Sequence, residues 1–210
     1  MSTVFPPITT TDCIGIEPAR LVLRPLLKMD EEQFFQLVVQ NPELPLEQNA
    51  QGEVIVMAPT GTFTGESSGE IFIHLGSWNK AAKRGRVFDS STLFRFTNGA
   101  ARSPDAAFVE KSRCDPLTDK QRKGIARLTP NFVIELRSDI DRLVDLQAKL
   151  VEYIDNGVEL GWIVDPLLSQ VHLYEAGKPV QILNRPATVS GTGCVAGFVL
   201  DLKEIFTADG

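Results

Sequence analysis

The chain has 210 residues, 43% of them hydrophobic, and its 21 Lys and Arg against 27 Asp and Glu give a formal net charge of −6 at pH 7. This length fits one domain with a substantial core, and the balanced composition excludes an intrinsically disordered chain. The negative charge excludes nucleic-acid binding through bulk electrostatics, so such a contact would need a local basic patch.

Two stretches of the sequence could supply a basic patch, although both could equally be ordinary solvated surfaces. The first holds Lys80, Lys83, Arg84 and Arg86. The second holds Lys111, Arg113, Lys120, Arg122, Lys123 and Arg127.

The three cysteines, Cys13, Cys114 and Cys194, are widely separated and form no CxxC pair. This spacing argues against a disulfide framework and a zinc site, and it suits a reducing compartment. No basic start followed by an apolar run predicts a signal peptide, and no stretch approaches the length of a membrane span. We therefore expect a cytoplasmic protein without membrane contact.

The first part of the chain predicts an irregular arm followed by a helix. Residues 1–27 are rich in Thr and Pro, and we expect residues 28–210 to form a single domain. Asp30 is placed as an N-cap before a short amphipathic helix that ends near Asn41.

A hairpin and a long helix are expected next. Residues 44–47 and 54–57 read as strands on either side of a turn at 49–52. Residues 59–65 interrupt the strand pattern, and apolar residues at helical spacing then predict one long helix over 71–82.

The second half of the chain alternates strands and helices. Strands are predicted over 87–89 and 92–96 and at Asp105, followed by a short polar helix over 118–124. A strand over 131–137 comes next.

A helix over 141–156 then leads into strands 160–164 and 170–174, and residues 198–206 close the chain. Together the elements predict an α/β (α+β) fold with a mixed central sheet, a crossover helix after the central strand, and an N-terminal helix and hairpin as an elaboration.

Two carboxylates occur beside or inside apolar strands, where a charged side chain contributes nothing to packing. Asp105 precedes the apolar residues 106–109, and Glu135 lies inside the strand 131–137. Burying a carboxylate without a partner costs several kcal/mol, and a divalent cation would supply that partner. Magnesium favours one or two carboxylates together with water and phosphate oxygens. Asp105 and Glu135 fall on two consecutive strands, which we expect to be neighbours in the sheet. The pair therefore predicts a site for Mg²⁺ (or Mn²⁺) that hydrolyses a phosphodiester.

Two cations are candidates to assist these carboxylates. Arg137 projects to the same side of its strand as Glu135, because side chains alternate with a period of two, and could neutralise charge in the transition state. Lys149 lies on the rim of the apolar stripe of the following helix and could orient or deprotonate an attacking water.

Structural roles remain open for all of these residues. Asp105 could cap a turn after Pro104, Glu135 could form a plain ion pair with Arg137 or another basic residue, and Lys149 could lie on a solvated helix edge. No CxxC or HExxH motif accompanies His74 or His172, so a zinc site is not expected, and we expect His172 to point at solvent.

Four segments of the sequence resemble the Uma2 family, which is described as putative restriction endonucleases: residues 103–109, 130–138, 141–153 and 156–166. The likeness spans roughly residues 30–205. The resemblance implies membership of the PD-(D/E)XK nuclease superfamily, whose core is a mixed four-stranded sheet flanked by helices.

The resemblance also implies roles for particular residues. Asp105 and Glu135 match the two metal-binding acids, and a further acid from the first core helix would be Glu70 or, as a second candidate, Glu66. The position usually held by lysine is Arg137, and Lys149 matches the place to which such families are thought to move the lysine.

The resemblance therefore implies a metal-dependent endonuclease that hydrolyses DNA and acts as a homodimer, because cutting both strands of a duplex takes two sites. Two alternatives stay open. The chain could be a catalytically inactive nuclease-fold module for DNA binding or dimerisation. It could also be an unrelated small-molecule hydrolase, which would show a deep apolar pocket away from the carboxylates.

Overall fold

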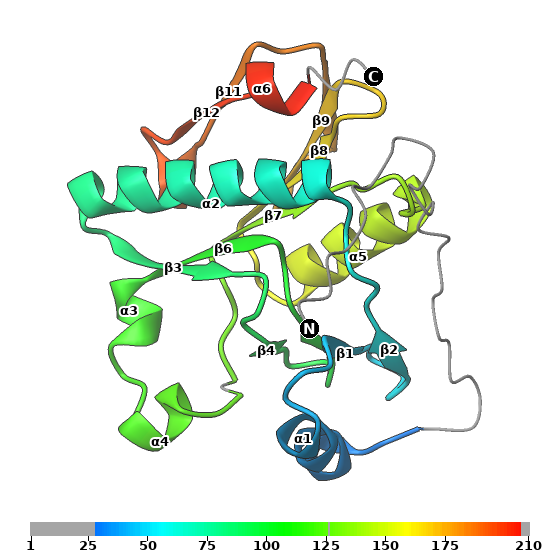
Figure 1. Cartoon of the computed structure of the whole chain (residues 1–210). Helices are drawn as coiled ribbons and strands as arrows, with labels where there is room; N and C mark the ends of the chain where they lie inside the picture. The colour runs from blue at the N-terminus through cyan, green and yellow to red at the C-terminus, as the bar shows by residue number, and fades with distance from the viewer. Residues whose placement is uncertain (1–27, 126, 207–210) are drawn as a thin grey trace, which may run out of the picture.

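The centre of the molecule is a six-stranded mixed sheet with the strand order β10-β9-β8-β7-β6-β3 (Figure 1). The computed structural model describes residues 28–125 and 127–206, so the predicted N-terminal arm lies outside the described residues. The strands are β3 (Gly85–Asp89), β6 (Ala106–Glu110), β7 (Phe132–Leu136), β8 (Leu160–Asp165), β9 (Gln170–Glu175) and β10 (Gln181–Asn184). β7 and β8 run parallel, and the other neighbouring pairs run antiparallel.

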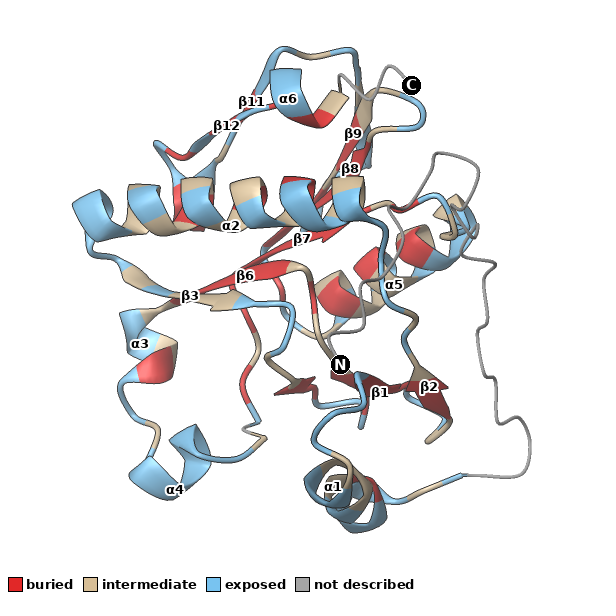
Figure 2. Cartoon of the chain, viewed as in Figure 1, coloured by how far each residue is buried: buried red, intermediate tan, exposed pale blue. Residues whose placement is uncertain are grey.

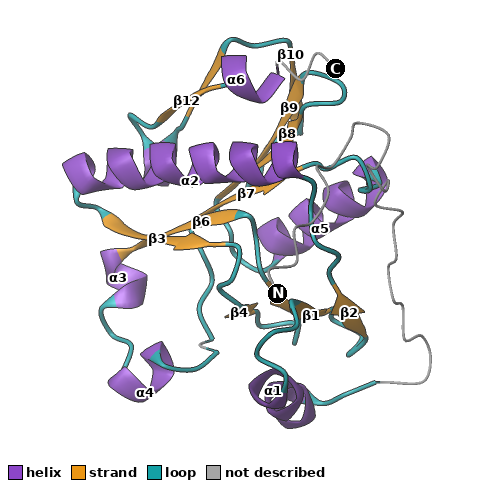
Figure 3. Ribbon diagram, in the orientation of Figure 1, coloured by secondary structure: helices purple, strands orange, loops and turns teal. Residues whose placement is uncertain are grey.

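One long helix covers each face of this sheet (Figure 3). Helix α2 (Thr62–Ala82) packs Ile71 and Leu75 on the face formed by the even-numbered residues of β7. Helix α5 (Leu143–Asp155) packs Leu146, Leu150 and Tyr153 on the opposite face. Because side chains alternate along a strand, Glu135 falls on the α5 face, between two apolar positions of β7.

The central strands are buried on both sides, whereas the helices expose their polar faces to solvent (Figure 2). β7 and β8 are buried at every residue. Strands covered on both faces read as continuous apolar runs, so a charged residue inside β7 needs a partner within the protein.

A second, four-stranded sheet with the order β2-β1-β5-β4 lies beside α5 and carries the N-terminal helix. Its elements are α1 (Glu31–Gln40), β1 (Leu46–Gln48), β2 (Val54–Val56), β4 (Phe94–Arg95) and β5 (Ala101–Arg102). Asp30 caps α1 in a capping box with Gln33, and β1 and β2 pair as an antiparallel hairpin, which confirms both predictions. β5 leads directly to Asp105.

The remaining elements flank the main sheet. They are α3 (Lys111–Cys114), α4 (Asp119–Arg122), β11 (Thr188–Ser190), the 3₁₀ turn Gly193–Val195, β12 (Val199–Asp201) and α6 (Lys203–Phe206). Within the described residues, none of the helices combines the length and the apolar character needed to cross a membrane.

Two predicted elements differ from the structure. Helix α2 begins at Thr62, so residues 62–65 are helical and not part of the break that was expected over 59–65. Its first turns are rich in Gly and Ser, which have low helix propensity, and the packing of Ile71 and Leu75 on the sheet outweighs that preference. The closing segment 198–206 divides into β12 and α6.

Candidate active site

Asp105 and Glu135 lie side by side at the ends of neighbouring strands. β6 and β7 pair antiparallel with Ala106 opposite Ile134, so the next position along each strand places Asp105 opposite Glu135. The carboxylate Oδ2 of Asp105 accepts a hydrogen bond from the backbone N–H of Leu136 at 2.7 Å. The sequence prediction that these two strands are neighbours is therefore confirmed.

Glu135 is 3% exposed and receives donors from two side chains of α5. The ammonium Nζ of Lys149 lies 3.0 Å from Oε1 and donates to Oε2 at 3.1 Å. The Tyr153 hydroxyl donates to Oε1 at 2.8 Å. Lys149 and Tyr153 are one helical turn apart, so a single face of α5 supplies both contacts.

A third carboxylate, Glu47 of β1, binds the other side of the Lys149 ammonium. Oε1 of Glu47 lies 3.0 Å from Nζ and also accepts the Ser103 N–H at 2.9 Å. Its Oε2 lies 3.1 Å from Nη1 of Arg102. The Lys149 ammonium is thus held between Glu47 and Glu135, at the junction of the two sheets.

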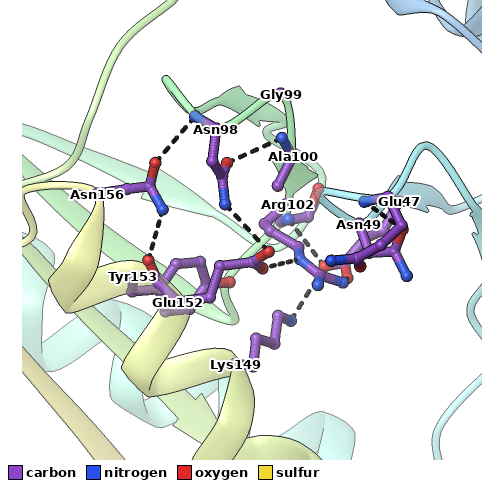
Figure 4. A network of polar contacts seen from close by, with 12 residues as sticks. Glu47, Asn49, Asn98, Gly99, Ala100, Arg102, Lys149, Glu152, Tyr153 and Asn156 are labelled. Carbon is purple, nitrogen blue, oxygen red and sulfur yellow. Dashed lines mark hydrogen bonds and ion pairs between the residues drawn. The ribbon is translucent and has the colours of Figure 1, made fainter.

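The network continues outward from Arg102 (Figure 4). The Nε of Arg102 lies 2.6 Å from Oε2 of Glu152, whose other oxygen accepts a hydrogen bond from Asn98 at 3.3 Å. Asn156 in turn accepts the Asn98 backbone N–H at 3.1 Å. These contacts tie the C-terminal half of α5 to the loop that follows β4.

The three inner carboxylates have different pKa values because their surroundings differ. Burial raises the pKa of Glu135 to about 8, against the opposing charge of Lys149 and with the support of Asp105 and Glu47. Burial also raises the pKa of Asp105 to about 6, although the Leu136 N–H lowers it in part. Burial alone would raise the pKa of Glu47, but Lys149, Arg102 and the Ser103 N–H outweigh it and lower that pKa. Glu47 is therefore well neutralised, whereas Asp105 and Glu135 are not.

We call six ionisable side chains of this region the acid cluster. They are Glu47, Arg102, Asp105, Glu135, Lys149 and Glu152. With every group ionised, four carboxylates face two cations, which leaves an excess of two negative charges in a largely water-excluded region. One divalent cation carries the charge that would balance this excess.

The donor set of the acid cluster fits a hard cation. Within the parts of the chain that the structure describes, no three His, Cys, Asp or Glu side chains are grouped closely enough to form a complete metal site by themselves. Magnesium needs only one or two carboxylates, because water and substrate phosphate supply its other oxygens. Asp105 and Glu135, with raised pKa values and neighbouring positions, are the two carboxylates that could hold it.

Comparison with known proteins identifies the family and the fold of the chain. The sequence profile of Uma2, described as a putative restriction endonuclease family, matches residues 31–203. The chain belongs to this family. The structure is similar to the crystal structure of a putative nuclease belonging to DUF820 from Anabaena variabilis, with a TM-score of 0.66 and 20% identity over 77% of this chain and 89% of that chain. That likeness shows the fold, and no curated protein matches the chain.

Family membership places the chain among nuclease-like proteins, and the fold class predicted from the sequence is confirmed. The described central sheet has six strands, whereas the resemblance implies a core of four. β3 and β10 are its two edge strands, and each pairs antiparallel with its neighbour.

The structure does not bring Arg137 to the acid cluster. Its Nη1 lies 2.9 Å from Oδ2 of the fully buried Asp165, and its Nε donates to the backbone carbonyl of Asp141 at 3.2 Å. The ion pair considered for Glu135 from the sequence is therefore formed with another basic residue, Lys149, and not with Arg137. β7 ends at Leu136, so the alternation expected to align the two side chains stops before Arg137.

Glu70 and Glu66 lie on α2, which covers the sheet face opposite Glu135. The Glu70 carboxylate is 41% exposed and lies 3.9 Å from the ring of His74. Glu66 is exposed as well. No described contact joins either acid to the acid cluster, so a role for them as metal ligands stays a prediction.

Sequence reasoning missed Glu47 and Arg102. The signal that singled out Glu135, an acid inside an apolar strand, applies to Glu47 too, because Leu46 precedes it in the first strand of the hairpin. Arg102 lies three residues before Asp105 and gave no such signal. The expectation that His172 points at solvent is wrong, because this residue is 2% exposed on β9.

Proposed function

We propose that this protein is a metal-dependent endonuclease that hydrolyses phosphodiester bonds in DNA, with Mg²⁺ or Mn²⁺ as its cofactor. The observation that carries the proposal is the pair of neighbouring carboxylates of Asp105 and Glu135, whose pKa values burial raises. Family membership supports a nucleic acid as the substrate. The carboxylate pair supports a divalent metal, which would stabilise both groups in their ionised form.

Asp105 and Glu135 would hold the metal in this scheme. Bound there, the ion would polarise the scissile phosphate and lower the pKa of an attacking water. Asp105 is fixed by the Leu136 N–H and Glu135 by the Tyr153 hydroxyl, so both carboxylates are oriented before any ligand arrives. Orientation of this kind lowers the reorganisation that the reaction requires.

Lys149 would act as a cation and not as a base. Burial would lower its pKa, but Glu135 and Glu47 raise it above the ordinary value. The amine therefore keeps its proton at neutral pH and cannot accept one from water. Its ammonium can donate to the attacking water or to a phosphate oxygen and offset the negative charge that develops there.

Glu47 and Arg102 would position that ammonium. Glu47 accepts from three donors, and Arg102 is held in turn by Glu152, so the place of Lys149 is fixed from the side opposite Glu135. We therefore expect Glu47→Gln to lower the cutting rate, because it weakens the contact that positions Lys149. Glu152→Gln removes only the more distant contact with Arg102 and should lower the cutting rate less.

The alternative of a small-molecule hydrolase has one observation to consider. A cavity of about 240 Å³ lies between β3, α3 and α4, lined by Phe88, Phe94, Leu117 and Leu128 among others. It is smaller than the 300–1,000 Å³ typical of ligand pockets. None of its lining residues belongs to the acid cluster, as this alternative expects. The volume of the cavity, however, is too small to support a small-molecule active site there.

The direct test is nicking and linearisation of supercoiled plasmid DNA with Mg²⁺ or Mn²⁺. We expect the wild-type protein to cut, and Asp105→Asn, Glu135→Gln and Lys149→Met each to lower the rate by about 10²-fold or more. Glu43→Gln, which removes an exposed carboxylate before β1, is the matched control, and we expect it to cut at the wild-type rate. A folded wild-type protein that binds metal but cuts neither plasmid nor linear duplex would favour the inactive module instead.

We also propose that the protein acts as a homodimer, since a single site cuts one strand at a time. Light scattering after size-exclusion chromatography should give twice the chain mass of 23.1 kDa. A monomer across the concentrations used for cutting would contradict this part of the proposal.

A further inference from the structure

The two basic stretches of the sequence form one surface in the folded protein. The N–H of Lys111, at the start of α3, donates to the carbonyl of Arg84 at 3.1 Å. Arg86 of β3 lies 3.7 Å from Asp115, just after α3. Figure 1 shows the C-terminal end of α2, the start of β3, α3 and α4 on the same side of the molecule. We call this the basic surface; its exposed cations are Lys80, Lys83, Arg84, Arg86, Lys111, Lys120, Arg122 and Lys123.

The charge of this region opposes that of the whole chain. Residues 80–86 and 110–127 contain ten Lys or Arg against three Asp or Glu, a local formal charge of +7 in a chain whose total is −6. A positive region on an acidic protein directs a polyanion to that region and away from the rest of the surface.

The lysines of the basic surface are available to a ligand. Arg84 and Arg86 lie near Glu110 and Asp115, at 3.9 and 3.7 Å. By contrast, Lys111, Lys120 and Lys123 form no ion pair with any other residue that the structure describes. Exposed ammonium groups of this kind bind phosphate as point charges without first breaking an internal contact.

The basic surface and the acid cluster flank the same strand. Asp105 precedes the first residue of β6, and Lys111 follows its last. Five residues of strand span about 17 Å, which is half of one turn of a DNA duplex, about 34 Å. Cys114 of α3 also packs on the sheet face that carries α5 and Glu135. A duplex that lies along β6 with its cut phosphate at Asp105 would reach α3 with its backbone about half a turn away.

We propose that the basic surface binds the phosphate backbone of double-stranded DNA beside the cutting site. The inference rests on the proposed function, because it takes the acid cluster as the place where the backbone is cut. Contact with phosphates alone carries no base preference, so this surface contributes affinity and register without sequence specificity.

The test compares two triple variants that remove the same charge. One is Lys111→Gln, Lys120→Gln and Lys123→Gln on the basic surface. The control is Lys28→Gln, Lys178→Gln and Lys203→Gln, three exposed lysines elsewhere. Binding of a fluorescent DNA duplex about three helical turns long is followed by anisotropy in EDTA, at several salt concentrations. Circular dichroism confirms that each variant is folded.

We expect the surface variant to bind on the order of tenfold more weakly, and the slope of log K against log salt to fall in magnitude by about 2 to 3. The control should stay within about twofold of wild type. Equal losses in both variants, or no loss in the surface variant, would overturn the proposal.

Plasmid cutting by the same proteins separates this proposal from the one on which it rests. If the wild-type protein cuts, and the surface variant binds and cuts equally well, the role of the basic surface is refuted and the nuclease proposal stands. Duplex binding that depends on the three lysines, in a wild-type protein that never cuts, would support the surface and refute the nuclease.

Discussion

Glu135 lies among groups that favour opposite protonation states. Burial raises its pKa from the ordinary 4.5 to about 8, and Lys149 opposes that rise only in part. Between these two values the folded protein keeps a proton that the unfolded chain releases. The contribution of Glu135 to stability is therefore fully present below about pH 4.5 and is lost as the pH rises toward 8.

This protonation predicts a pH-dependent difference between wild type and Glu135→Gln. In metal-free buffer, the variant should gain stability relative to wild type as the pH rises from 5 to 8, by at most about 1.4 kcal/mol per pH unit. Urea unfolding at a series of pH values measures this difference. Parallel pH profiles for the two proteins would contradict the raised pKa of Glu135.

Tyr153 gives a second prediction at the scale of single atoms. Its hydroxyl is buried and donates to Glu135 Oε1. Tyr153→Phe leaves the carboxylate with one donor fewer, and we expect the free energy of unfolding to fall by about 1–3 kcal/mol. Tyr174→Phe on β9 is the matched control, because that hydroxyl makes no hydrogen bond to another described residue. Equal losses in the two variants would show that the hydrogen bond to Glu135 contributes nothing of its own.

At the scale of elements, the contact between α5 and β8 decides where Lys149 lies. Gly161 of β8 leaves room for Leu150, whose Cδ1 would lie 2.4 Å from a Cβ at that position. Leu150 is fully buried and follows Lys149 directly, so a shift of α5 would move the ammonium. We expect Gly161→Ala to lower the free energy of unfolding by about 1–3 kcal/mol and to slow plasmid cutting.

The matched control for Gly161 lies on the other long helix. A Cβ added at Gly76 of α2 would meet no other atom within 4 Å, so Gly76→Ala should stabilise the protein by about 0.5–1 kcal/mol and leave cutting unchanged. Thermal unfolding and plasmid assays on both variants test the pair. Undiminished cutting by a folded Gly161→Ala protein would show that Lys149 tolerates displacement.

Elements with strong local signals were predicted from the sequence. The N-cap at Asp30, the hairpin and the crossover helix each follow from short-range chemistry, and their predicted positions agree with the structure to within a few residues. The pairing of β6 with β7 followed from their order along the chain. The N-terminal half of α2 was missed, because glycines and serines concealed a helix that tertiary packing stabilises.

At the scale of the whole molecule, the parts that sequence reasoning missed depend on long-range contacts. Glu47 meets Lys149 across about a hundred residues of chain, through the packing of the hairpin against α5, and no local pattern encodes that contact. The merging of two basic stretches into one surface depends in the same way on β3 pairing with β6. The prediction for Arg137 extended the alternation of β7 one residue past the end of the strand.

The central claim is that Asp105 and Glu135 together bind one divalent cation, which holds both carboxylates in their ionised form. Calorimetric titration of Mn²⁺ into the metal-free wild-type protein, Asp105→Asn and the control Glu43→Gln tests it most directly. We predict one ion bound per chain in wild type and in Glu43→Gln, and no binding in Asp105→Asn. Binding that survives Asp105→Asn unchanged, or its absence from the folded wild-type protein, would contradict the account.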